Sequence, residues 1–148
     1  MKKYFILSVS LLVLGFVSRA NFTVDEKVLK TFKETFSKAE QVKWEEFTDN
    51  YVVNFFEAGI RERVSYDRDG NFLNATRYFG EEHLPVNILC KIKKKYPEQK
   101  VFGVTEVETP DDIQYYIKLE DATNWTTLKS DTGGNLELVE KYKRAAEN

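Results

Sequence analysis

The sequence predicts an α+β domain in which two tandem αββββ repeats form one curved antiparallel sheet, with both helices on one face. Three observations lead to this prediction. The phrase Asp-x-x-Gly-Asn occurs at residues 67–71 and again at 131–135, and these residue types favour tight turns between strands. Apolar residues recur at helical spacing in two segments, 28–36 and 88–96, and alternating strand-like runs follow each of them.

Residues 1–20 have the pattern of a signal peptide. Two lysines follow Met1, an apolar run extends from Phe5 to Val17, and Ser18 and Ala20 supply the small residues of a cleavage site. A membrane anchor would need about 20 apolar residues, more than this run contains. Cleavage after Ala20 would leave 128 residues, the size of one compact domain. We therefore expect a periplasmic or extracellular protein with no stable membrane anchor.

The net charge argues against one class of partner, and the cysteine content limits the disulfides that can form. After cleavage the chain has 19 basic and 24 acidic residues, a formal charge of −5, which argues against nucleic acid as a partner. Cys90 is the single cysteine, so no internal disulfide can form. The repeat places Cys90 on the outward side of its helix, where it either forms an intermolecular disulfide or stays a shielded, inert thiol. A monomer or a weak dimer is expected.

The first repeat, residues 21–79, is expected to hold one helix and four strands. Thr23 and Glu26 have the spacing of a capping box, which predicts that the helix begins there and ends near residue 37 or 38. Val42 and Trp44 then alternate with polar residues, as in a half-buried strand. Three further strands are predicted around residues 51–56, 61–66 and 72–79.

The second repeat, residues 80–148, has the same order. Leu84-Pro85 opens its helix, because proline is tolerated at the first helical position, and Pro97 ends it. The apolar positions of the first helix recur sixty residues later, and Phe102 and Val104 correspond to Val42 and Trp44 at the same offset. A longer turn near residues 109–111 raises the offset to 64 for the remaining strands, which indicates a tandem duplication.

No pattern in the chain predicts a catalytic residue, a metal site or a cofactor. Asp67, Asp69 and Asn71 alternate as calcium ligands would, but the twelfth position of that loop is Tyr78 instead of glutamate. His83 is the single histidine, which excludes a His-rich zinc site, and we expect it in an exposed loop. No phosphate-binding loop or nucleophile elbow is present. Metal-dependent hydrolysis is kept only as a residual alternative.

Aromatic and basic residues are expected on the face of the sheet that the helices leave open. Alternation places Phe56, Tyr116 and Trp125 opposite the core-facing residues of their strands. The neighbouring positions hold Arg61, Arg63 and Lys118. Aromatic and arginine side chains dominate protein interfaces, so these six residues are predicted to bind a partner. The alternative is that they only cover the sheet or form a dimer contact.

Several short stretches resemble the PepSY-like proteins of bacterial envelopes, a family similar in fold to the β-lactamase inhibitor protein. They are Trp44, the run Val-Ser-Tyr-Asp-Arg-Asp-Gly at 64–70, Leu84-Pro85, Tyr96-Pro97 and Val-Thr-Glu-Val-Glu at 104–108. The resemblance implies the tandem layout and a bacterial periplasmic or extracellular location. Related PepSY domains accompany peptidases as inhibitory or folding segments, and the β-lactamase inhibitor binds an enzyme with its concave sheet. The second turn departs from the first, with Gly133 in place of Asp69.

These observations predict a non-enzymatic protein that recognises a protein partner, with hydrolases as one class, through the open face of the sheet. The alternative is a sensor or carrier that takes up a small apolar molecule or a peptide between the sheet and the helices. A flat aromatic and basic face would favour the first hypothesis. A closed pocket of several hundred Å³ would favour the second.

Overall fold

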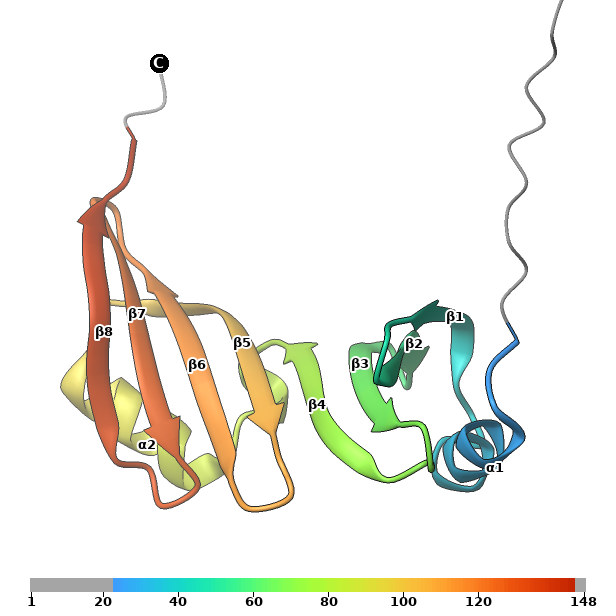
Figure 1. Ribbon diagram of the computed structural model, residues 1–148. Coiled ribbons are helices and arrows are strands. Elements are labelled where there is room, and N and C mark those ends of the chain that lie inside the picture. The colour runs from blue at the N-terminus through green and yellow to red at the C-terminus, as the bar shows by residue number, and fades with distance from the viewer. Residues whose placement is uncertain (1–22, 146–148) are drawn as a thin grey trace, which may run out of the picture.

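The computed structural model describes residues 23–145, so the predicted signal peptide, residues 1–20, lies outside the described residues. Within them, eight strands form one antiparallel sheet in the order of the chain (Figure 1). The elements are α1 (Glu26–Thr35), β1 (Glu40–Glu46), β2 (Asn50–Glu57), β3 (Ile60–Asp67), β4 (Phe72–Phe79), η1 (Glu81–His83), α2 (Val86–Lys95), β5 (Lys100–Glu108), β6 (Ile113–Glu120), β7 (Asn124–Asp131) and β8 (Leu136–Lys143).

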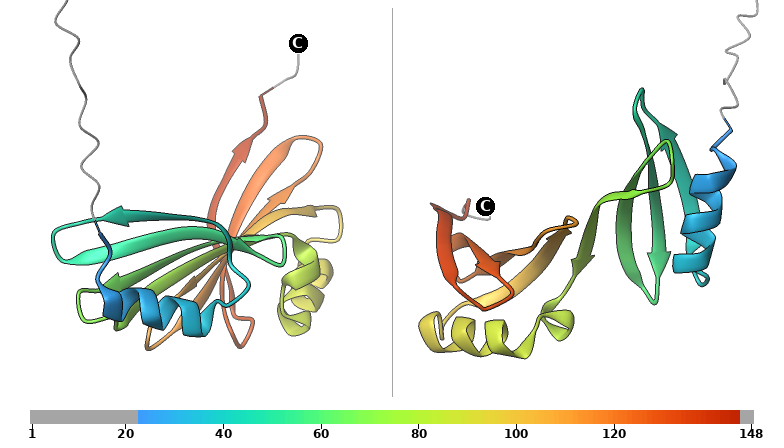
Figure 2. Two further views of the ribbon diagram at one scale, coloured as in Figure 1. Left: turned by 90° about the vertical axis from the view of Figure 1, so that its right-hand side faces the viewer. Right: turned by 60° about the horizontal axis from the view of Figure 1, so that its bottom comes forward.

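The order of one helix and four strands occurs twice, which confirms the predicted α+β fold of two αββββ repeats. The two helices start sixty positions apart, and β3 and β7 start sixty-four positions apart. In the right-hand view of Figure 2 the two halves of the sheet meet at an angle, and each helix lies on the outer side of the bend. The opposite side of the sheet, called here the uncovered face, carries no helix.

Each helix packs on its own half of the sheet and forms its own core. The first core is rich in aromatic rings and the second is mainly aliphatic. The first contains Val24, Val28, Phe32, Tyr51, Val53, Phe55, Val64, Tyr66 and Ala75. The second contains Leu84, Ile88, Ile92, Val104, Tyr115, Ile117, Leu119 and Leu128. The apolar helix positions that the repeat brings into register are therefore the ones that face the sheet.

The start of α1 differs from the predicted capping box. The helix begins at Glu26, Asp25 occupies the N-cap position, and Asp25 makes no side-chain capping hydrogen bond. Thr23 therefore lies too far upstream to cap. The buried side chain of Val24 belongs to the first core, which holds this segment in a non-helical conformation. The second helix begins at Val86, directly after Pro85, as predicted.

A β-bulge interrupts the first strand of each repeat. The pairing register shifts between Glu40 and Lys43 in β1 and between Val101 and Gly103 in β5. Strict alternation would put Phe102 on the same face as Val104, but Val104 is 3% exposed and Phe102 is 62% exposed. The extra residue of a bulge reverses the facing of the residues beside it. Phe102 therefore lies on the uncovered face, a difference from the strand pattern read in the sequence.

The two Asp-x-x-Gly-Asn phrases form matching turns, as predicted. The Asp67 carboxylate accepts hydrogen bonds from the backbone N–H groups of Asp69 and Asn71, both at 2.9 Å. The Asp131 carboxylate accepts one from the backbone N–H of Asn135 at 3.0 Å. The side-chain amide of each Asn also donates to the Asp, at 2.8 Å in the first turn and 2.6 Å in the second. The carboxylates are thus used by the turns themselves.

Each turn also contacts the helix of its own repeat, and the acceptor of that contact differs between Asp69 and Gly133. In the first repeat the Lys27 ammonium lies 3.0 Å from the Asp69 carboxylate. In the second repeat Lys91 donates to the backbone carbonyl of Gly133 at 2.9 Å. A lysine thus joins helix to turn in both repeats, with a carboxylate as acceptor in one and a carbonyl in the other.

Candidate functional site

The six residues predicted to bind a partner all lie on the uncovered face. Strand register places Phe56 beside Arg61 and places Arg61 beside Tyr78 of β4. The same row continues across the sheet through Thr105 to Tyr116. Neighbouring strands are about 4.8 Å apart, so this row crosses from the first repeat to the second within about 20 Å.

The first half of the face carries two arginines with different surroundings. The Arg61 guanidinium lies over the Tyr78 ring, 4.7 Å from its centroid, and has no carboxylate partner within residues 23–145. Arg63 lies 3.5 Å from a carboxylate oxygen of Glu45 and 3.4 Å from the side-chain oxygen of Asn54. Arg61 is therefore available to an incoming carboxylate, whereas Arg63 is already paired.

The second half of the face carries a group of three rings and two cations, called here the aromatic cluster: Phe102, Trp125, Tyr142, Lys118 and Arg144. The Phe102 and Trp125 rings meet edge to face with centroids 4.9 Å apart. The Lys118 ammonium lies 4.9 Å and the Arg144 guanidinium 5.0 Å from the Trp125 ring centroid. Lys118 also donates a hydrogen bond of 2.7 Å to the Tyr142 hydroxyl. Cations are attracted to ring faces at such distances, so these contacts hold the cluster in place.

A shallow hollow lies beside the aromatic cluster, where the two repeats join. Its volume is about 350 Å³, and its lining comes from β4 to β7: Tyr78, Phe79, Phe102, Gly103, Val104, Thr105, Tyr116, Lys118 and Thr127. A Cβ placed on Gly103 would meet no atom within 4 Å, so the absent side chain leaves this space open. The hollow is mostly apolar and suits a protruding apolar side chain.

The structure brings some of the predicted residues into contact and adds further residues to the site. Lys118 and Trp125 are in contact, and Tyr116 lines the hollow, while Arg63 lies on the far side of Arg61. Sequence reasoning missed the roles of Tyr78, Phe102, Tyr142 and Arg144. Gly103 was a signal for the bulge that exposes Phe102, because glycine inside a strand often marks one. Arg144 had no such signal, since it follows the last strand.

The helix-covered face holds a second polar group, which links the repeats. Arg77 of β4 lies 3.4 Å from a carboxylate oxygen of Glu62 and 3.2 Å from one of Glu106. Glu62 is 5% exposed and Glu106 is 8% exposed. Burial raises the pKa of Glu62 above its ordinary value, against the opposing effect of the Arg77 charge. One arginine therefore holds two buried carboxylates from different repeats.

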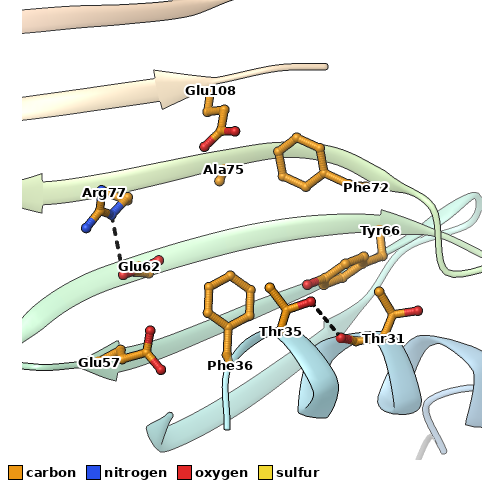
Figure 3. Close-up of a pocket in the computed structure, with 10 residues that line it drawn as sticks. All are labelled: Thr31, Thr35, Phe36, Glu57, Glu62, Tyr66, Phe72, Ala75, Arg77 and Glu108. Carbon is orange, nitrogen blue, oxygen red and sulfur yellow. Dashed lines mark hydrogen bonds and ion pairs between the residues drawn. The ribbon is translucent and has the colours of Figure 1, made fainter. Parts of the chain in front are cut away.

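A cavity of about 390 Å³ lies beside this ion cluster, between α1 and strands β2 to β5. It is called here the helix-side cavity. Figure 3 shows Glu57, Glu62 and Arg77 toward one side of it and the rings of Tyr66 and Phe72 toward the other. Its full lining is Thr31, Thr35, Phe36, Glu57, Glu62, Tyr66, Phe72, Ala75, Arg77 and Glu108.

The residues most often used in catalysis are dispersed. His83 lies exposed in η1 and its ring packs edge-on against Phe79, with the centroids 6.0 Å apart. Cys90 is a free, exposed thiol on α2, on the outward side that the repeat predicts. Within residues 23–145, no group of three His, Cys, Asp or Glu side chains has the arrangement of a metal site. None of the helices in that range is long and apolar enough to span a bilayer.

Comparisons with solved structures show that the chain shares its fold with proteins of Bacteroides species. A BLIP-like protein of Bacteroides fragilis superposes with a TM-score of 0.63 at 19% identity, covering 87% of this chain and 92% of its own. A candidate periplasmic protein of Bacteroides eggerthii gives 0.61 at 16% identity, covering 82% and 90%. A DUF2874 family protein of Bacteroides ovatus gives 0.61 at 22% identity, covering 82% and 89%.

The structural similarity to BLIP-like and DUF2874 proteins confirms, at the level of fold, the resemblance read from the sequence. No protein-family model matches the sequence. The search of curated proteins finds no match either.

Proposed function

We propose that this chain is an exported, non-enzymatic binding protein that recognises a protein partner through the uncovered face of its sheet. The observation that carries the proposal is the aromatic cluster with its two cations, on a face that no helix covers. Aromatic and arginine side chains are the residues that most often dominate binding energy at protein interfaces. Exposed rings that already pack against one another lose little side-chain freedom when a partner covers them.

The charges on the uncovered face favour a partner surface that carries carboxylates. Arg61 and Lys118 contact aromatic rings, and neither has a carboxylate partner within the described part of the chain. A partner carboxylate could therefore pair with either cation without breaking an existing ion pair. The hollow between them is mostly apolar and would accept an apolar side chain of the same partner.

The likeness to a BLIP-like protein and to a candidate periplasmic protein supports both the binding class and a location in the cell envelope. The predicted signal peptide would direct export and be cleaved after Ala20. A hydrolase is one class of partner consistent with the resemblance to envelope inhibitors. Because one fold can serve unrelated functions, the proposal depends on the aromatic cluster and not on the fold.

The test is capture of a partner from bacterial envelope extract with residues 21–148 as bait. The double variant Lys118→Ala/Trp125→Ala should weaken capture about thirtyfold, the loss of a typical hot spot. The matched control is Lys30→Ala/Val86→Ala, which removes one exposed cation and one exposed apolar side chain on the helices. Its capture should equal that of the unmodified chain.

Thermal midpoints of all three proteins are measured in parallel, so that loss of binding is not confused with loss of folding. Equal capture by the Lys118/Trp125 variant and the control would show that the uncovered face does not bind the partner. A large fall in the midpoint of that variant alone would show that its side chains belong to the core.

A second candidate function, carriage of a small molecule between the sheet and a helix, is favoured by the helix-side cavity. The cavity has the position expected of such a carrier. Its lining contains three glutamates beside its aromatic rings, so the lining fits a cationic ligand better than the apolar ligand anticipated from the sequence.

A further inference from the structure

The sheet has two open edges within residues 23–145. Its strands follow one another from β1 to β8 without closing into a barrel, so β1 and β8 each pair with one neighbour. Figure 1 shows these two strands at opposite ends of the sheet. An edge strand presents a row of backbone N–H and C=O groups with which another strand can pair. The edges are therefore a second candidate surface, separate from the uncovered face.

The duplication relates the two edges to a strand pair that is already present in the sheet. Because the repeats have the same order of elements, β8 corresponds to β4 and β1 corresponds to β5. β4 and β5 pair with each other where the repeats join, and residues 77–79 lie opposite residues 104–106 there. The strand that corresponds to β8 thus pairs with the strand that corresponds to β1.

The backbone registers of the edge strands match those of their counterparts. Residues 141–142 of β8 pair with β7 in the register in which residues 77–78 of β4 pair with β3. Residues 44–46 of β1 pair with β2 in the register in which residues 104–106 of β5 pair with β6. The β-bulges of both edge strands lie outside these residues. Since the inner register of an antiparallel ladder decides which backbone groups point outward, the two outer edges are copies of the edges that join the repeats.

The register of the junction, applied to two copies of the chain, brings opposite charges together. It places Lys141 of one copy opposite Glu46 of the next, in the positions of Arg77 and Glu106, whose side chains lie 3.2 Å apart. Glu46 also pairs with Arg68 through one carboxylate oxygen, at 2.8 Å, which leaves its second oxygen for the lysine. The ion pair that links the repeats therefore has an equivalent between copies.

The net charges of the two edges have opposite signs. Residues 40–46 contain three glutamates and one lysine, a net charge of −2. Residues 140–144 contain one glutamate, two lysines and one arginine, a net charge of +2. Opposite charges across a strand pair stabilise it, and like charges destabilise it. Each edge therefore disfavours pairing with the same edge of a second copy and favours pairing with the other edge.

We propose that the chain associates head to tail with further copies of itself, by pairing β8 of one copy with β1 of the next. Each contact leaves one β1 and one β8 free at the ends of the assembly, so the contact repeats along a row of copies. The copied ladder spans only residues 141–143 and 44–46, and a contact this small is weak. It lies at the edges of the sheet and not on the uncovered face, so the proposal is independent of partner recognition.

The test is sedimentation velocity of residues 21–148, from about 10 µM to about 1 mM, the range in which weak contacts assemble. The mean sedimentation coefficient should rise with concentration and should pass the value of a dimer. Added salt should reduce the association, because it screens the charges of the two edges. A chain that stays monomeric throughout would overturn the proposal. Assembly that stops at the dimer would indicate pairing of two identical surfaces and would also overturn it.

Charge-reversal variants locate the contact. Lys141→Glu and Glu46→Lys should each weaken self-association about tenfold, because a like pair replaces an opposite pair. An equimolar mixture of the two should associate as the unmodified chain does, because the reversed β8 of the first variant matches the reversed β1 of the second. Pairing of two identical edges predicts no such rescue.

The matched control is Lys94→Glu, an equal charge change at an exposed position of α2, which should associate as the unmodified chain does. Thermal midpoints are measured in parallel, because Glu46→Lys also removes the pair with Arg68. If that variant does not fold, Glu46→Gln replaces it and should weaken association about threefold. Unchanged association of Lys141→Glu, or no rescue in a mixture of folded variants, would refute the assignment.

Discussion

The two repeats share one backbone plan but differ in which side of the sheet carries most of their aromatic side chains. In the first repeat most rings are inside, where Phe32 lies 5.2 Å from Phe55 and 5.3 Å from Trp44, centroid to centroid, whereas Phe56 and Tyr78 lie on the uncovered face. In the second repeat the core is mainly aliphatic, and Phe102 and Trp125 lie on the uncovered face. The first repeat therefore buries most of its rings, and the second exposes more of its rings on the uncovered face than the first does.

Three matched positions show exchanges between rings and other side chains. Ile92 occupies the position of Phe32, and Leu119 occupies that of Phe55, so rings inside the first repeat become aliphatic in the second. On the uncovered face the change runs the other way, since Trp125 occupies the position of Arg61. Stability explains the first exchange, because either residue type fills a core. It does not explain an added ring on an exposed face, which is why the second repeat is assigned the larger share of binding.

The sharpest test of this difference compares Phe55→Ala with Trp125→Ala. Phe55 is 1% exposed and packs against the rings of Phe32 and Phe36, so its truncation should lower the free energy of unfolding by about 3–5 kcal/mol. Trp125 lies on the uncovered face, and its truncation should cost about 1 kcal/mol or less. Urea denaturation of both variants gives the two values.

The control for that comparison is the aliphatic residue that the second repeat has at the position of Phe55. Leu119→Ala, at the position equivalent to Phe55, should cost about 2–5 kcal/mol, because it opens a cavity in the second core. A cost for Trp125→Ala as large as that for Leu119→Ala would place the aromatic cluster in the structural core. The contrast between the two repeats would then disappear.

A smaller effect is expected at the junction of the repeats, in the variant Arg77→Gln. The change leaves Glu62 and Glu106 without their cation, and it should lower stability at pH 7 by about 2 kcal/mol, less than for a fully buried pair because Arg77 is partly exposed. The pKa of Glu62, already raised by burial, should rise further once the Arg77 charge is gone. A raised carboxyl pKa means that the protonated form favours folding, so stability is lost as pH rises through that pKa.

The measurement for Arg77→Gln is therefore thermal unfolding at several pH values. The deficit relative to the unmodified chain should be largest at pH 7 and above and should shrink as pH falls, as the Glu62 carboxyl takes up a proton. Arg61→Gln, on the uncovered face and without a carboxylate partner in residues 23–145, is the control and should show no such trend. A deficit that is constant with pH would contradict the assigned role of Arg77.

Most of the fold could be predicted from the sequence because the same pattern of helix, strands and turn occurs twice. The turn at 67–71 and its copy at 131–135 fix the strand register around them, and the apolar helix positions recur at a constant offset. The six predicted face residues follow from strict alternation, which holds in β2, β3, β6 and β7. Regular strands make such inference reliable, since facing alternates with every residue.

The parts that could not be read depend on irregular backbone or on pairing between distant strands. The bulge at Val101–Gly103 places Phe102 on the uncovered face, whereas strict alternation would place it on the same face as Val104. The Glu62–Arg77–Glu106 cluster joins three strands by their register, and no local pattern indicates that these residues meet. The helix-side cavity likewise draws residues from α1 and four strands. Such features arise from packing, which short-range sequence patterns do not describe.

The smallest effect is expected for the variants Asp67→Asn and Asp131→Asn, which compare the two Asp turns. Hydrogen bonds from Asn71 hold the pKa of Asp67 below its ordinary value, and those from Asn135 do the same for Asp131. A lowered carboxyl pKa stabilises the fold above the ordinary carboxyl range, and this stabilisation is lost as pH falls through the folded-state pKa. Both variants should therefore melt a few degrees lower at pH 7 and should approach the unmodified chain toward pH 2.

The matched control for the turns is Asp111→Asn, an exposed position in the turn between β5 and β6, which should leave the midpoint unchanged. Asp67 accepts backbone hydrogen bonds from two residues, Asp69 and Asn71, whereas Asp131 accepts its close one from Asn135, so Asp67→Asn should have the larger effect. Equal effects would show that the bond to Asp69 contributes little. A deficit that persists unchanged at pH 2 would show that the ionised carboxylates are not what stabilises the turns, because the lost contribution must vanish once both aspartates are protonated.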